Sequence, residues 1–422
     1  MNKSSRISGL HKMTIEERAK IVREFAGLSE EESALLGQSS SLGLETADRM
    51  IENVIGTFEL PMGIVPNMVV NGKELLVPIA VEESSVVAAL ANAAKMVRSG
   101  GGFFTSTSDP IMIAQIQAVN IADPFGAKIR ILERRQEIID FANQQDPILV
   151  KLGGGCRDIE VRVIDSRIGP MVVTHILVDT RDAMGANAVN TMAEALAPFI
   201  EKWTGGKVFL RILSNLADRR IARARCLVKK EAIPPGPEVI DGIVNAWAFA
   251  DADPYRAATN NKGIMNGVSA LVIATGNDFR AIEAGAHAYA AKTGRYRALA
   301  KWEKDAEGNL VGSLEMPLAM GLVGGATAIH PMAKLAVKIL GVETAAQLAE
   351  ITAAVGLGQN LAALRVLASE GVQKGHMSLH AKNIAIMAGA QGEEIDTVAA
   401  QLASEGKVRV DRAEEILRGM RK

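Results

Sequence analysis

The sequence predicts an α+β protein in which a large, mostly helical domain is interrupted by a smaller ferredoxin-like domain. Between about residues 109 and 215 the apolar pattern gives the element order β-α-β-β-α-β, which is the split βαβ arrangement of the ferredoxin-like fold. Strongly helical sequence then resumes, which indicates that the small domain is an insertion. A chain of 422 residues is also long for a single hydrophobic core.

The N-terminal region predicts helices followed by a hairpin. Capping boxes at residues 14–17 and 29–32 predict two helix starts. Asn71-Gly72 separates two apolar runs, and this dipeptide is the strongest short hairpin signal. The second strand leads directly into Glu82-Glu83 and a helix over about residues 84–98, so we expect both carboxylates at a strand-to-helix junction.

The remaining elements follow from periodicity and from turn residues. Within the insertion, strands are predicted at residues 111–119, 159–164, 171–179 and 208–213, with helices ending near residue 142 and covering 188–203. After it, residues 238–293 are mostly helical, a hairpin joins 296–302 to 310–314, and helical pieces follow at 344–354, 360–369, 378–388 and 396–403.

Composition and charge exclude several functional classes. A net charge of −1 gives no field for holding nucleic acid or an acidic membrane. The first 21 residues lack the apolar core of a secretory signal, and the longest uncharged run, residues 316–333, is interrupted by prolines and glycines, so we expect no membrane helix. Cys156 and Cys226 have no metal-ligand spacing, which suits a reducing cytoplasm.

One basic cluster is open to two interpretations. It comprises Arg219, Arg220, Arg223, Arg225, Lys229 and Lys230. The cluster is either a solvated face, which is the commoner case, or a seat for a phosphate-bearing cofactor.

The general motifs of cofactor binding are absent. There is no G-x-G-x-x-G, Walker loop, H-E-x-x-H or G-x-S-x-G, so a Rossmann dinucleotide site is not supported. A loop of mostly small residues does lie between a predicted strand and a predicted helix: Asp182, Ala183, Met184, Gly185, Ala186 and Asn187. Backbone amides at such a helix N-terminus suit a pyrophosphate, although the loop alone is a weak signal.

Two charged spots are candidates for chemistry. Glu82-Glu83 is either a partner of the helix dipole or a carboxylate pair in which repulsion raises one pKa and provides a proton donor. Lys262 lies among Asn and Gly residues ahead of the apolar run 268–274. This setting favours a partly buried ammonium, which polarises a carbonyl and stabilises the alkoxide formed on hydride addition.

Two further spots carry alternatives. Asp278 closes an apolar run and is either a cap for a helix over 279–290 or a catalytic acid. His376 and His380 have i,i+4 spacing and would share a helix face, as in some metal sites. No third ligand is evident, so an acid/base role or simple capping is favoured and no metal is expected.

Taken together, seven segments resemble class II hydroxymethylglutaryl-coenzyme A (HMG-CoA) reductases, most of all the mevalonate-degrading pseudomonad members. They lie in the family's order along nearly the whole chain: residues 52–61 (ENVIGTFELP), 81–85 (VEESS), 182–187 (DAMGAN), 214–218 (SNLAD), 253–267 (DPYRAATNNKGIMNG), 274–278 (ATGND) and 375–377 (GHM).

The resemblance implies a domain plan. Residues 1–108 and 219–374 would form a large domain that binds coenzyme A, residues 109–218 a small domain that binds the nicotinamide dinucleotide, and residues 375–422 a mobile helical flap. The active site would form between two subunits, which implies a homodimer or a multiple of it. No membrane segment and no nucleic acid partner are implied for this chain.

The resemblance also implies a reaction and residue roles. Mevalonate, coenzyme A and two NAD⁺ would be interconverted with HMG-CoA and two NADH, through mevaldehyde. Lys262 would stabilise the oxyanion, Glu83 would move a proton, Asp278 would tune both residues through hydrogen bonds, and His376 would protonate the departing thiolate. A closing flap would keep mevaldehyde bound between the two hydride transfers.

Binding residues follow from the same motifs. Ser85, Asn215, Arg256 and Asn266 match substrate-contacting positions, and Arg256 suits a free carboxylate. The loop 182–187 matches the dinucleotide site, and Asp146 matches the position near the adenosine ribose, which favours NAD(H) because a carboxylate repels a 2′-phosphate. His11 stands where mevalonate-degrading members carry arginine, and Ser84 where they carry proline.

Two other functional classes compete with the oxidoreductase. One is a catalytically inactive relative that only binds coenzyme A thioesters, and the other is a structural helical scaffold. The presence of Glu83, Lys262, Asp278 and His376 together argues against the inactive relative, and the Gly-rich polar loops argue against the scaffold.

Overall fold

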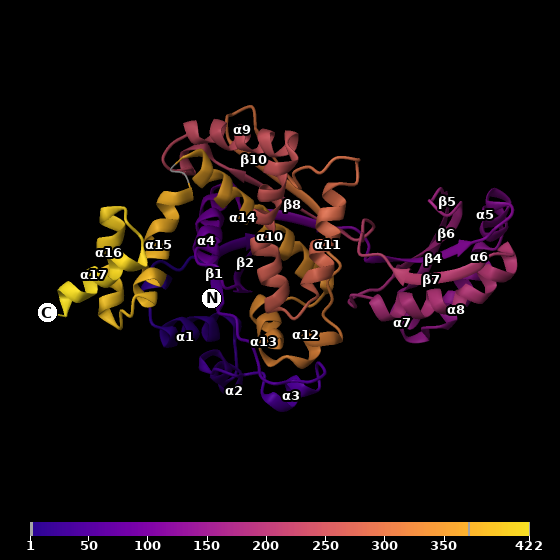
Figure 1. The fold of residues 1–422 in the computed structure, drawn as a ribbon, viewed down its shortest axis with the longest axis horizontal. Helices are drawn as coiled ribbons and strands as arrows, with labels where there is room; N and C mark the ends of the chain where they lie inside the picture. Colours follow the sequence, from indigo (N-terminus) through magenta and orange to yellow (C-terminus); the bar gives the residue numbers. More distant parts are fainter. Residues whose placement is uncertain (1–2, 370–371, 422) are drawn as a thin grey trace.

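The computed structural model describes residues 3–369 and 372–421, and within the helix that begins at Val372 it describes side chains from His380 onward. Three units follow one another across the molecule (Figure 1): a C-terminal helical unit, a central unit and a smaller α/β unit. The predicted α+β class with an inserted small unit is confirmed.

A six-stranded sheet with the order β2-β1-β3-β8-β10-β9 forms one layer of the central unit. Its strands are β1 (Met62–Val70), β2 (Lys73–Ala80), β3 (Phe103–Thr107), β8 (Ile221–Val228), β9 (Ala300–Lys304) and β10 (Leu310–Pro317). The predicted hairpin is present, because β1 and β2 pair antiparallel around Asn71 and Gly72, which both have positive φ. In the second hairpin β9 starts at Ala300, four residues later than predicted.

Helices pack around this sheet. They are α4 (Val86–Val97), α9 (Glu238–Ala252), α10 (Pro254–Ala274), α11 (Phe279–Ala290), α12 (Gly325–Ile329), α13 (Pro331–Leu340) and α14 (Ala345–Ala368). The N-terminal segment adds α1 (Ile15–Ala26), α2 (Glu30–Ala34) and α3 (Leu44–Asp48). Both predicted capping boxes form, at Thr14 and at Ser29.

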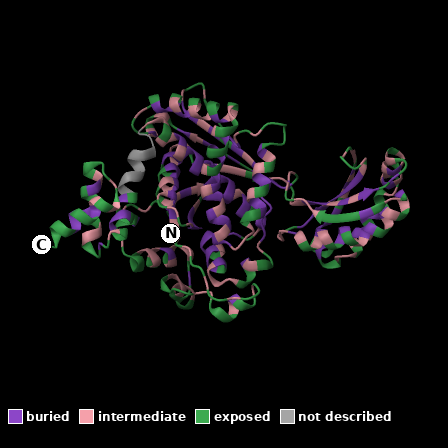
Figure 2. Ribbon diagram, in the orientation of Figure 1, coloured by how far each residue is buried: buried purple, intermediate pink, exposed green. Residues whose placement is uncertain are grey.

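Helix α14 lies in the middle of the central unit and is buried along most of its length (Figure 2). The prediction of two separate helical pieces here was wrong. Gly356 and Gly358 do not break the helix, because each permits a close approach: a Cβ at these positions would lie 2.9 Å from Val268 and 2.8 Å from Leu90. The helix is long and apolar enough to cross a membrane by composition, but 72 % of its most apolar stretch is buried inside the protein.

The small unit has the predicted βαββαβ order. Its sheet order is β5-β6-β4-β7, formed by β4 (Ile111–Val119), β5 (Gly155–Ile164), β6 (Met171–Asp179) and β7 (Lys207–Leu213). Its helices are α5 (Pro124–Glu133), α6 (Arg135–Gln144), α7 (Pro147–Lys151) and α8 (Ala186–Thr204). In chain order this sheet is 4-1-3-2, with its own hydrophobic core between the strands and α8. The short helix α7 was not predicted.

The small unit is attached to the central sheet by two neighbouring strands. The chain leaves β3 at Thr107 and returns into β8 at Ile221, and β3 and β8 pair antiparallel. The Ser108 amide donates to the Ile221 carbonyl at 2.9 Å, which extends the pairing beyond the strand ends. The insertion therefore has a two-stranded stem.

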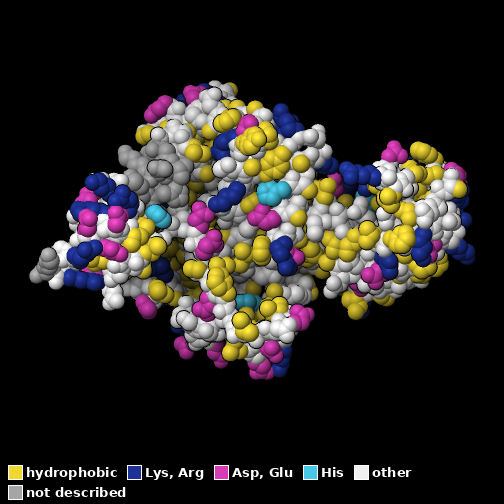
Figure 3. Space-filling model, in the orientation of Figure 1, with side chains coloured by type: hydrophobic (Ala, Val, Ile, Leu, Met, Phe, Trp, Pro, Cys, Tyr) yellow, Lys and Arg dark blue, Asp and Glu magenta, His cyan; other side chains and the backbone are white. Residues whose placement is uncertain are grey.

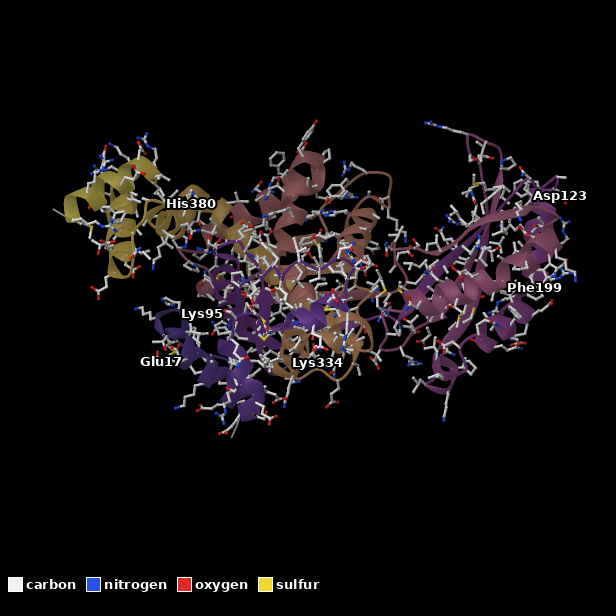
Figure 4. The ribbon with its side chains drawn as sticks, turned by 60° about the horizontal axis from the view of Figure 1, so that its bottom comes forward. Glu17, Lys95, Asp123, Phe199, Lys334 and His380 are labelled. Atoms are coloured by element: carbon white, nitrogen blue, oxygen red, sulfur yellow. The ribbon has the colours of Figure 1, made fainter. Side chains whose placement is uncertain are left out.

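The C-terminal unit consists of α15 (Val372–Met387), α16 (Glu393–Glu405) and α17 (Val410–Met420). It has a hydrophobic core of its own, which includes Ile384, Leu402 and Leu417. Figure 4 labels His380 on this unit and Phe199 on α8, at opposite ends of the molecule.

Candidate active site

The first feature of the site is an ion pair between Lys262 and Glu83. Lys262 Nζ lies 2.9 Å from Glu83 Oε2. The carboxylate comes from the junction of β2 with α4, and the ammonium comes from the N-terminal half of α10. Glu82, the other half of the predicted carboxylate pair, is exposed, so the partner of Glu83 is the lysine. The expectation of a partly buried lysine was wrong for the single chain, because 61 % of the Lys262 side chain is exposed.

Helix α10 brings three predicted residues to one cavity. Asp253 caps the helix through the Arg256 amide at 2.7 Å, and Pro254 occupies the first turn. Arg256, Lys262 and Asn266 then line the same cavity, with Lys262 and Asn266 one turn apart. Because Lys262 and Asn266 are i,i+4 neighbours, their side chains leave the same face of α10.

The junction before α4 supplies the opposite wall. Ser85 is the N-cap of α4, but its φ is +79° and its side chain makes no capping hydrogen bond. A positive φ at a serine is a strained conformation of the kind found at functional sites. The hydroxyl is therefore held at the cavity and is not used to satisfy the helix end.

The cavity has a volume of about 590 Å³ and lies between α4, α10 and α14. A pocket of this size suits a small-molecule ligand. Sequence reasoning missed the α14 wall, which presents Gln359 and Asn360 to the cavity. Two adjacent amides within an otherwise Ala-, Leu- and Gly-rich segment were the signal that could have identified them.

A buried amide network fixes α14 against α10. Asn360 Nδ2 donates to Asn260 Oδ1 at 2.9 Å, and Asn360 Oδ1 accepts from Trp302 Nε1 at 2.7 Å. Gln359 is almost fully buried, and its Oε1 has no hydrogen-bond partner among the described residues. An unsatisfied buried acceptor at a cavity wall is suited to a donor on a ligand.

Arg256 is the cationic group of the cavity besides Lys262. Among the described side chains no carboxylate lies within ion-pair distance of its guanidinium, and burial lowers its pKa from the usual value. A partly desolvated guanidinium without an acidic neighbour is a strong binding site for an anionic group such as a carboxylate.

Asp278 and Asn215, two further predicted site residues, are not among the residues that line this cavity. Asp278 caps α11, accepting from the Arg280 and Ala281 amides, and also pairs with the Arg280 side chain. From Lys262 to the end of α10 at Ala274 is twelve residues, or roughly 18 Å along the helix. The Asn215 carbonyl lies against Gly285 of α11. Asp278 is therefore a helix cap, as one interpretation predicted. The catalytic interpretation stays a prediction, because within one chain Asp278 lies beyond the far end of α10 from Lys262.

The predicted dinucleotide loop is the connection from β6 to α8. Gly185 is the N-cap of α8 with φ +98°, and a Cβ there would lie 2.3 Å from Thr180, so only glycine fits. No side chain caps α8, which leaves its first-turn amides free of side-chain acceptors. Asp182 is engaged by the central unit, where its Oδ1 accepts from the Ala345 amide at 2.7 Å.

Asp146 begins the short helix α7, and the chain just beyond α7 contacts the residue before this loop. It caps α7, accepting from the Leu149 amide at 2.9 Å. Just beyond α7, the Gly153 carbonyl accepts from Arg181, the residue before the loop, at 2.7 Å. Asp146 and the loop 182–187 are thus linked through α7 and Gly153 within the small unit.

The basic cluster does not form a single face. Arg219 pairs with Glu160 at 2.6 Å, and Arg223 pairs with Glu315 at 2.6 Å. Arg225 stacks on Phe104, 4.4 Å from the ring centre, whereas Arg220 is buried against the loop 182–187. Figure 3 likewise shows acidic and basic side chains interspersed on the face that it draws.

The histidines fall in α15. His376 lies outside the residues whose side chains are described, and His380 is exposed. The helix predicted over residues 378–388 is present but begins six residues earlier, because α15 spans Val372–Met387. No cluster of three His, Cys, Asp or Glu side chains arranged for a metal occurs among the described residues.

Comparison with known proteins gives this arrangement a context. The family model of hydroxymethylglutaryl-coenzyme A reductase matches residues 14–381. The chain belongs to this reductase family. It is 59 % identical over 419 residues to a 3-hydroxy-3-methylglutaryl-coenzyme A reductase of Archaeoglobus fulgidus, covering 99 % of this chain and 95 % of that relative. A probable reductase of Borreliella burgdorferi is 38 % identical over 348 residues, covering 79 % and 77 %.

Solved structures of HMG-CoA reductases agree. A class II reductase of Streptococcus pneumoniae, bound to NADPH in open conformations, superposes with a TM-score of 0.83 at 41 % identity, covering 97 % of this chain and all of that one. A second structure of the pneumococcal enzyme gives a TM-score of 0.84 at 41 % identity, covering 98 % and 99 %. The predicted family is confirmed and a solved relative is of class II, whereas a nearer likeness to the pseudomonad members stays a prediction.

Proposed function

We propose that this member of the HMG-CoA reductase family interconverts HMG-CoA with mevalonate and coenzyme A in the cavity between α4, α10 and α14. The observation that supports this most is the 2.9 Å pairing of Lys262 with Glu83 in a cavity that also holds Arg256, whose guanidinium has no ion-pair partner among the described side chains. In the direction of reduction, two reduced dinucleotides and two protons are consumed, and coenzyme A and mevalonate are released.

Each residue has a defined task in this proposal. The Lys262 ammonium stabilises the oxyanion that develops when a carbonyl accepts a hydride. Glu83, in contact with it, holds the proton that the oxygen needs on becoming a hydroxyl. Arg256 binds the free carboxylate at the far end of the substrate, and Ser85 and Asn266 offer hydrogen bonds from the two walls.

His376 is proposed to protonate the coenzyme A thiolate, on the strength of the family motif GHM. The chain's course supports this role. Leu367 lines the cavity, and α15 begins only five residues later, at Val372. The C-terminal unit, with its separate core, is proposed to be the flap that closes on the substrate.

The loop 182–187 fits a dinucleotide diphosphate. The first turn of α8 offers backbone amides without a side-chain cap, and Gly185 lets a ligand approach the backbone. When bound, the nicotinamide dinucleotide supplies or accepts the hydride in each step. We accordingly propose residues 109–218 as the dinucleotide domain, and residues 1–108 and 219–374 as the coenzyme A domain.

NAD(H) is the proposed cofactor. Asp146 supports it, since a carboxylate beside the adenosine ribose repels a 2′-phosphate. One Asp146 oxygen is used as the cap of α7, which leaves the other for a ribose hydroxyl. The NADPH bound to the pneumococcal relative favours the alternative cofactor, NADP(H).

A homodimer is proposed because one chain does not complete the site. The rise from Lys262 to the end of α10 at Ala274 is roughly 18 Å, and Asp278 lies beyond that end, so a partner subunit is the available source of this carboxylate. In the motif 52–61, Ile55 and Phe58 are almost fully exposed, as expected of a face that a second copy covers. We expect the dimer to be cytoplasmic.

A single assay tests the proposal against its alternative, an inactive relative that only binds coenzyme A thioesters. Mevalonate, coenzyme A and oxidised dinucleotide are mixed with the protein, and absorbance at the reduced-nicotinamide band is followed. Growth of the band in proportion to protein supports the reductase. Coenzyme A binding without turnover would show that the inactive relative is correct.

A further inference from the structure

Arg220, just before β8, joins the small and central units. Its side chain is 6 % exposed, although it is charged and one of the longest in the protein. No carboxylate lies within ion-pair distance of it in the described parts of the chain. Burial lowers its pKa to about 10, so the guanidinium stays protonated at neutral pH.

The guanidinium donates to the backbone around the loop 182–187. Nη1 donates to the Ala183 carbonyl at 2.9 Å, to the Met184 carbonyl at 3.2 Å and to Thr180 Oγ1 at 2.9 Å. Nη2 donates to the Arg181 carbonyl at 3.4 Å and to the Met320 carbonyl of the central unit. One side chain therefore binds both the loop and the segment that follows β10.

Burying a cation whose neighbouring carboxylates, Asp179 and Asp182, lie beyond ion-pair distance is costly, so an apolar residue would serve simple packing better. What the guanidinium supplies is a set of donors in one plane. Its bonds to the carbonyls of Ala183 and Met184 fix the backbone of the loop directly ahead of the uncapped first turn of α8. Its positive charge behind the N-terminus of α8 also adds to the helix dipole.

The loop is connected further into the central unit. Asp182 Oδ1 accepts from the amide of Ala345, the first residue of α14, and the Asp182 carbonyl accepts from the Leu322 amide at 2.9 Å. Fourteen residues along α14, or about 21 Å, Gln359 forms part of the cavity wall. A fixed loop is thus at a fixed distance from the proposed catalytic cavity.

We propose that Arg220 is a positioning residue that holds the backbone of residues 182–187 in the conformation that receives the dinucleotide diphosphate. This inference rests on the proposed function, in which that loop binds the cofactor. It predicts that replacing Arg220 lowers the affinity for the dinucleotide and leaves the binding of HMG-CoA unchanged.

The test compares full-length Arg220→Gln, Arg220→Lys and the control Arg223→Gln. Arg223 lies on β8, is about half exposed and is paired with Glu315. Arg220→Gln should raise the Kd and KM for the dinucleotide by about ten- to hundred-fold, because small displacements of a binding loop are costly. KM for HMG-CoA should stay within about two-fold, since its cavity walls are untouched. Arg220→Lys should be intermediate and Arg223→Gln should match wild type.

The outcomes separate this inference from the function on which it rests. Turnover by the wild type with unchanged dinucleotide affinity in a folded Arg220→Gln variant would overturn the role of Arg220 and leave the function standing. Absence of dinucleotide binding by the wild type would overturn the function itself. If Arg220→Gln does not fold, Thr180→Val removes one of the same acceptors: a weaker dinucleotide affinity supports the inference, and an unchanged one contradicts it.

Discussion

Lys262 and Glu83 are 179 residues apart in the sequence, and their side chains meet with Nζ 2.9 Å from Oε2. Both side chains are partly exposed, and ion pairs of that kind contribute only about 0–1 kcal/mol to stability. The pair is therefore not needed to hold α10 against the β2–α4 junction. Its value lies in the charge that it presents to the cavity, so variants of either residue should remain folded.

Lys262→Ala should lose nearly all hydride transfer, by about 10²–10³-fold in kcat or more, because the oxyanion loses its stabilising charge. Coenzyme A binding should persist. Lys262→Arg should not restore activity, since a planar fork does not replace a point charge. Lys301→Ala, an exposed lysine paired with Glu303, is the matched control. Substantial turnover by Lys262→Ala would mean that another group holds the oxyanion.

Asp278 and Lys262 from different subunits should complement each other. Lys262→Ala and Asp278→Ala should each be inactive alone. After the two are unfolded, mixed and refolded together, half of the dimers are hybrids with one intact site, so about a quarter of wild-type activity should return. Recovery of activity is measured against each variant refolded by itself. If mixing restores nothing, each site is built from one chain and α10 and α11 must rearrange.

Asp146→Ala should reduce the preference for NAD(H) over NADP(H). The physical reason is the loss of a negative charge near the ribose, where a 2′-phosphate would otherwise be repelled. The measurement is the ratio of kcat/KM for the two cofactors. Because Asp146 also caps α7, Asp146→Asn serves as the control that keeps a cap without the charge. Equal use of both cofactors by the wild type would contradict the proposal.

His376→Gln should slow the complete reaction severely and leave the reduction of free mevaldehyde largely intact. Only the complete reaction has a thiolate to protonate. His380→Gln should affect neither reaction, which makes it the control within the same helix. Equal loss of both half-reactions in His376→Gln would instead assign the residue to closure of the C-terminal unit. Loss of activity on chelation, reversed by metal, would revive the two-histidine metal site.

Acid should weaken the N-terminal attachment through Glu74. Its carboxylate accepts from Arg98 and from the Ser5 amide, and the Arg98 guanidinium lowers its pKa to about 2. Since the folded pKa lies below the ordinary value of 4.5, the stabilisation is complete above pH 4.5 and is lost as the pH falls towards 2. Glu74→Gln should cost about 1–3 kcal/mol at pH 7 and much less near pH 3.

Urea unfolding at both pH values measures this difference. Glu303→Gln, which removes an exposed pair, should cost less than about 1 kcal/mol at either pH. A cost of Glu74→Gln that does not change between pH 7 and pH 3 would show that its carboxylate is not what holds the segment.

The sequence predicted an element well where its formation depends on residues that are neighbours along the chain. The alternation in the insertion gave the bounds of β4 and β6 without error, and both capping boxes form. The sequence failed at α14, because Gly356 and Gly358 are explained by neighbours on α4 and α10 that are distant in sequence. It could not place Asp278 relative to Lys262 for the same reason: the separation depends on how a whole helix is packed.

The residues of the candidate site likewise fall into those that local motifs predict and those that depend on tertiary packing. Glu83, Ser85, Arg256, Lys262 and Asn266, predicted from motifs, converge on one cavity. Gln359 and Asn360 were missed because the role of a polar residue inside an apolar helix depends on which residues of other elements pack against it. The exposure of Lys262 was also unforeseen, since burial of a side chain depends on the elements packed against it.

The two-stranded stem allows the inserted unit to be exchanged without breaking the central sheet. β3 and β8 are antiparallel neighbours, so a tight turn in place of the inserted unit would leave an ordinary hairpin in the central sheet. Neither hydrophobic core draws on the other to any large extent. The insertion is therefore an exchangeable module of the host sheet, and a homologous module that keeps the loop bonded by Arg220 should fold in its place, carrying its own cofactor preference with it.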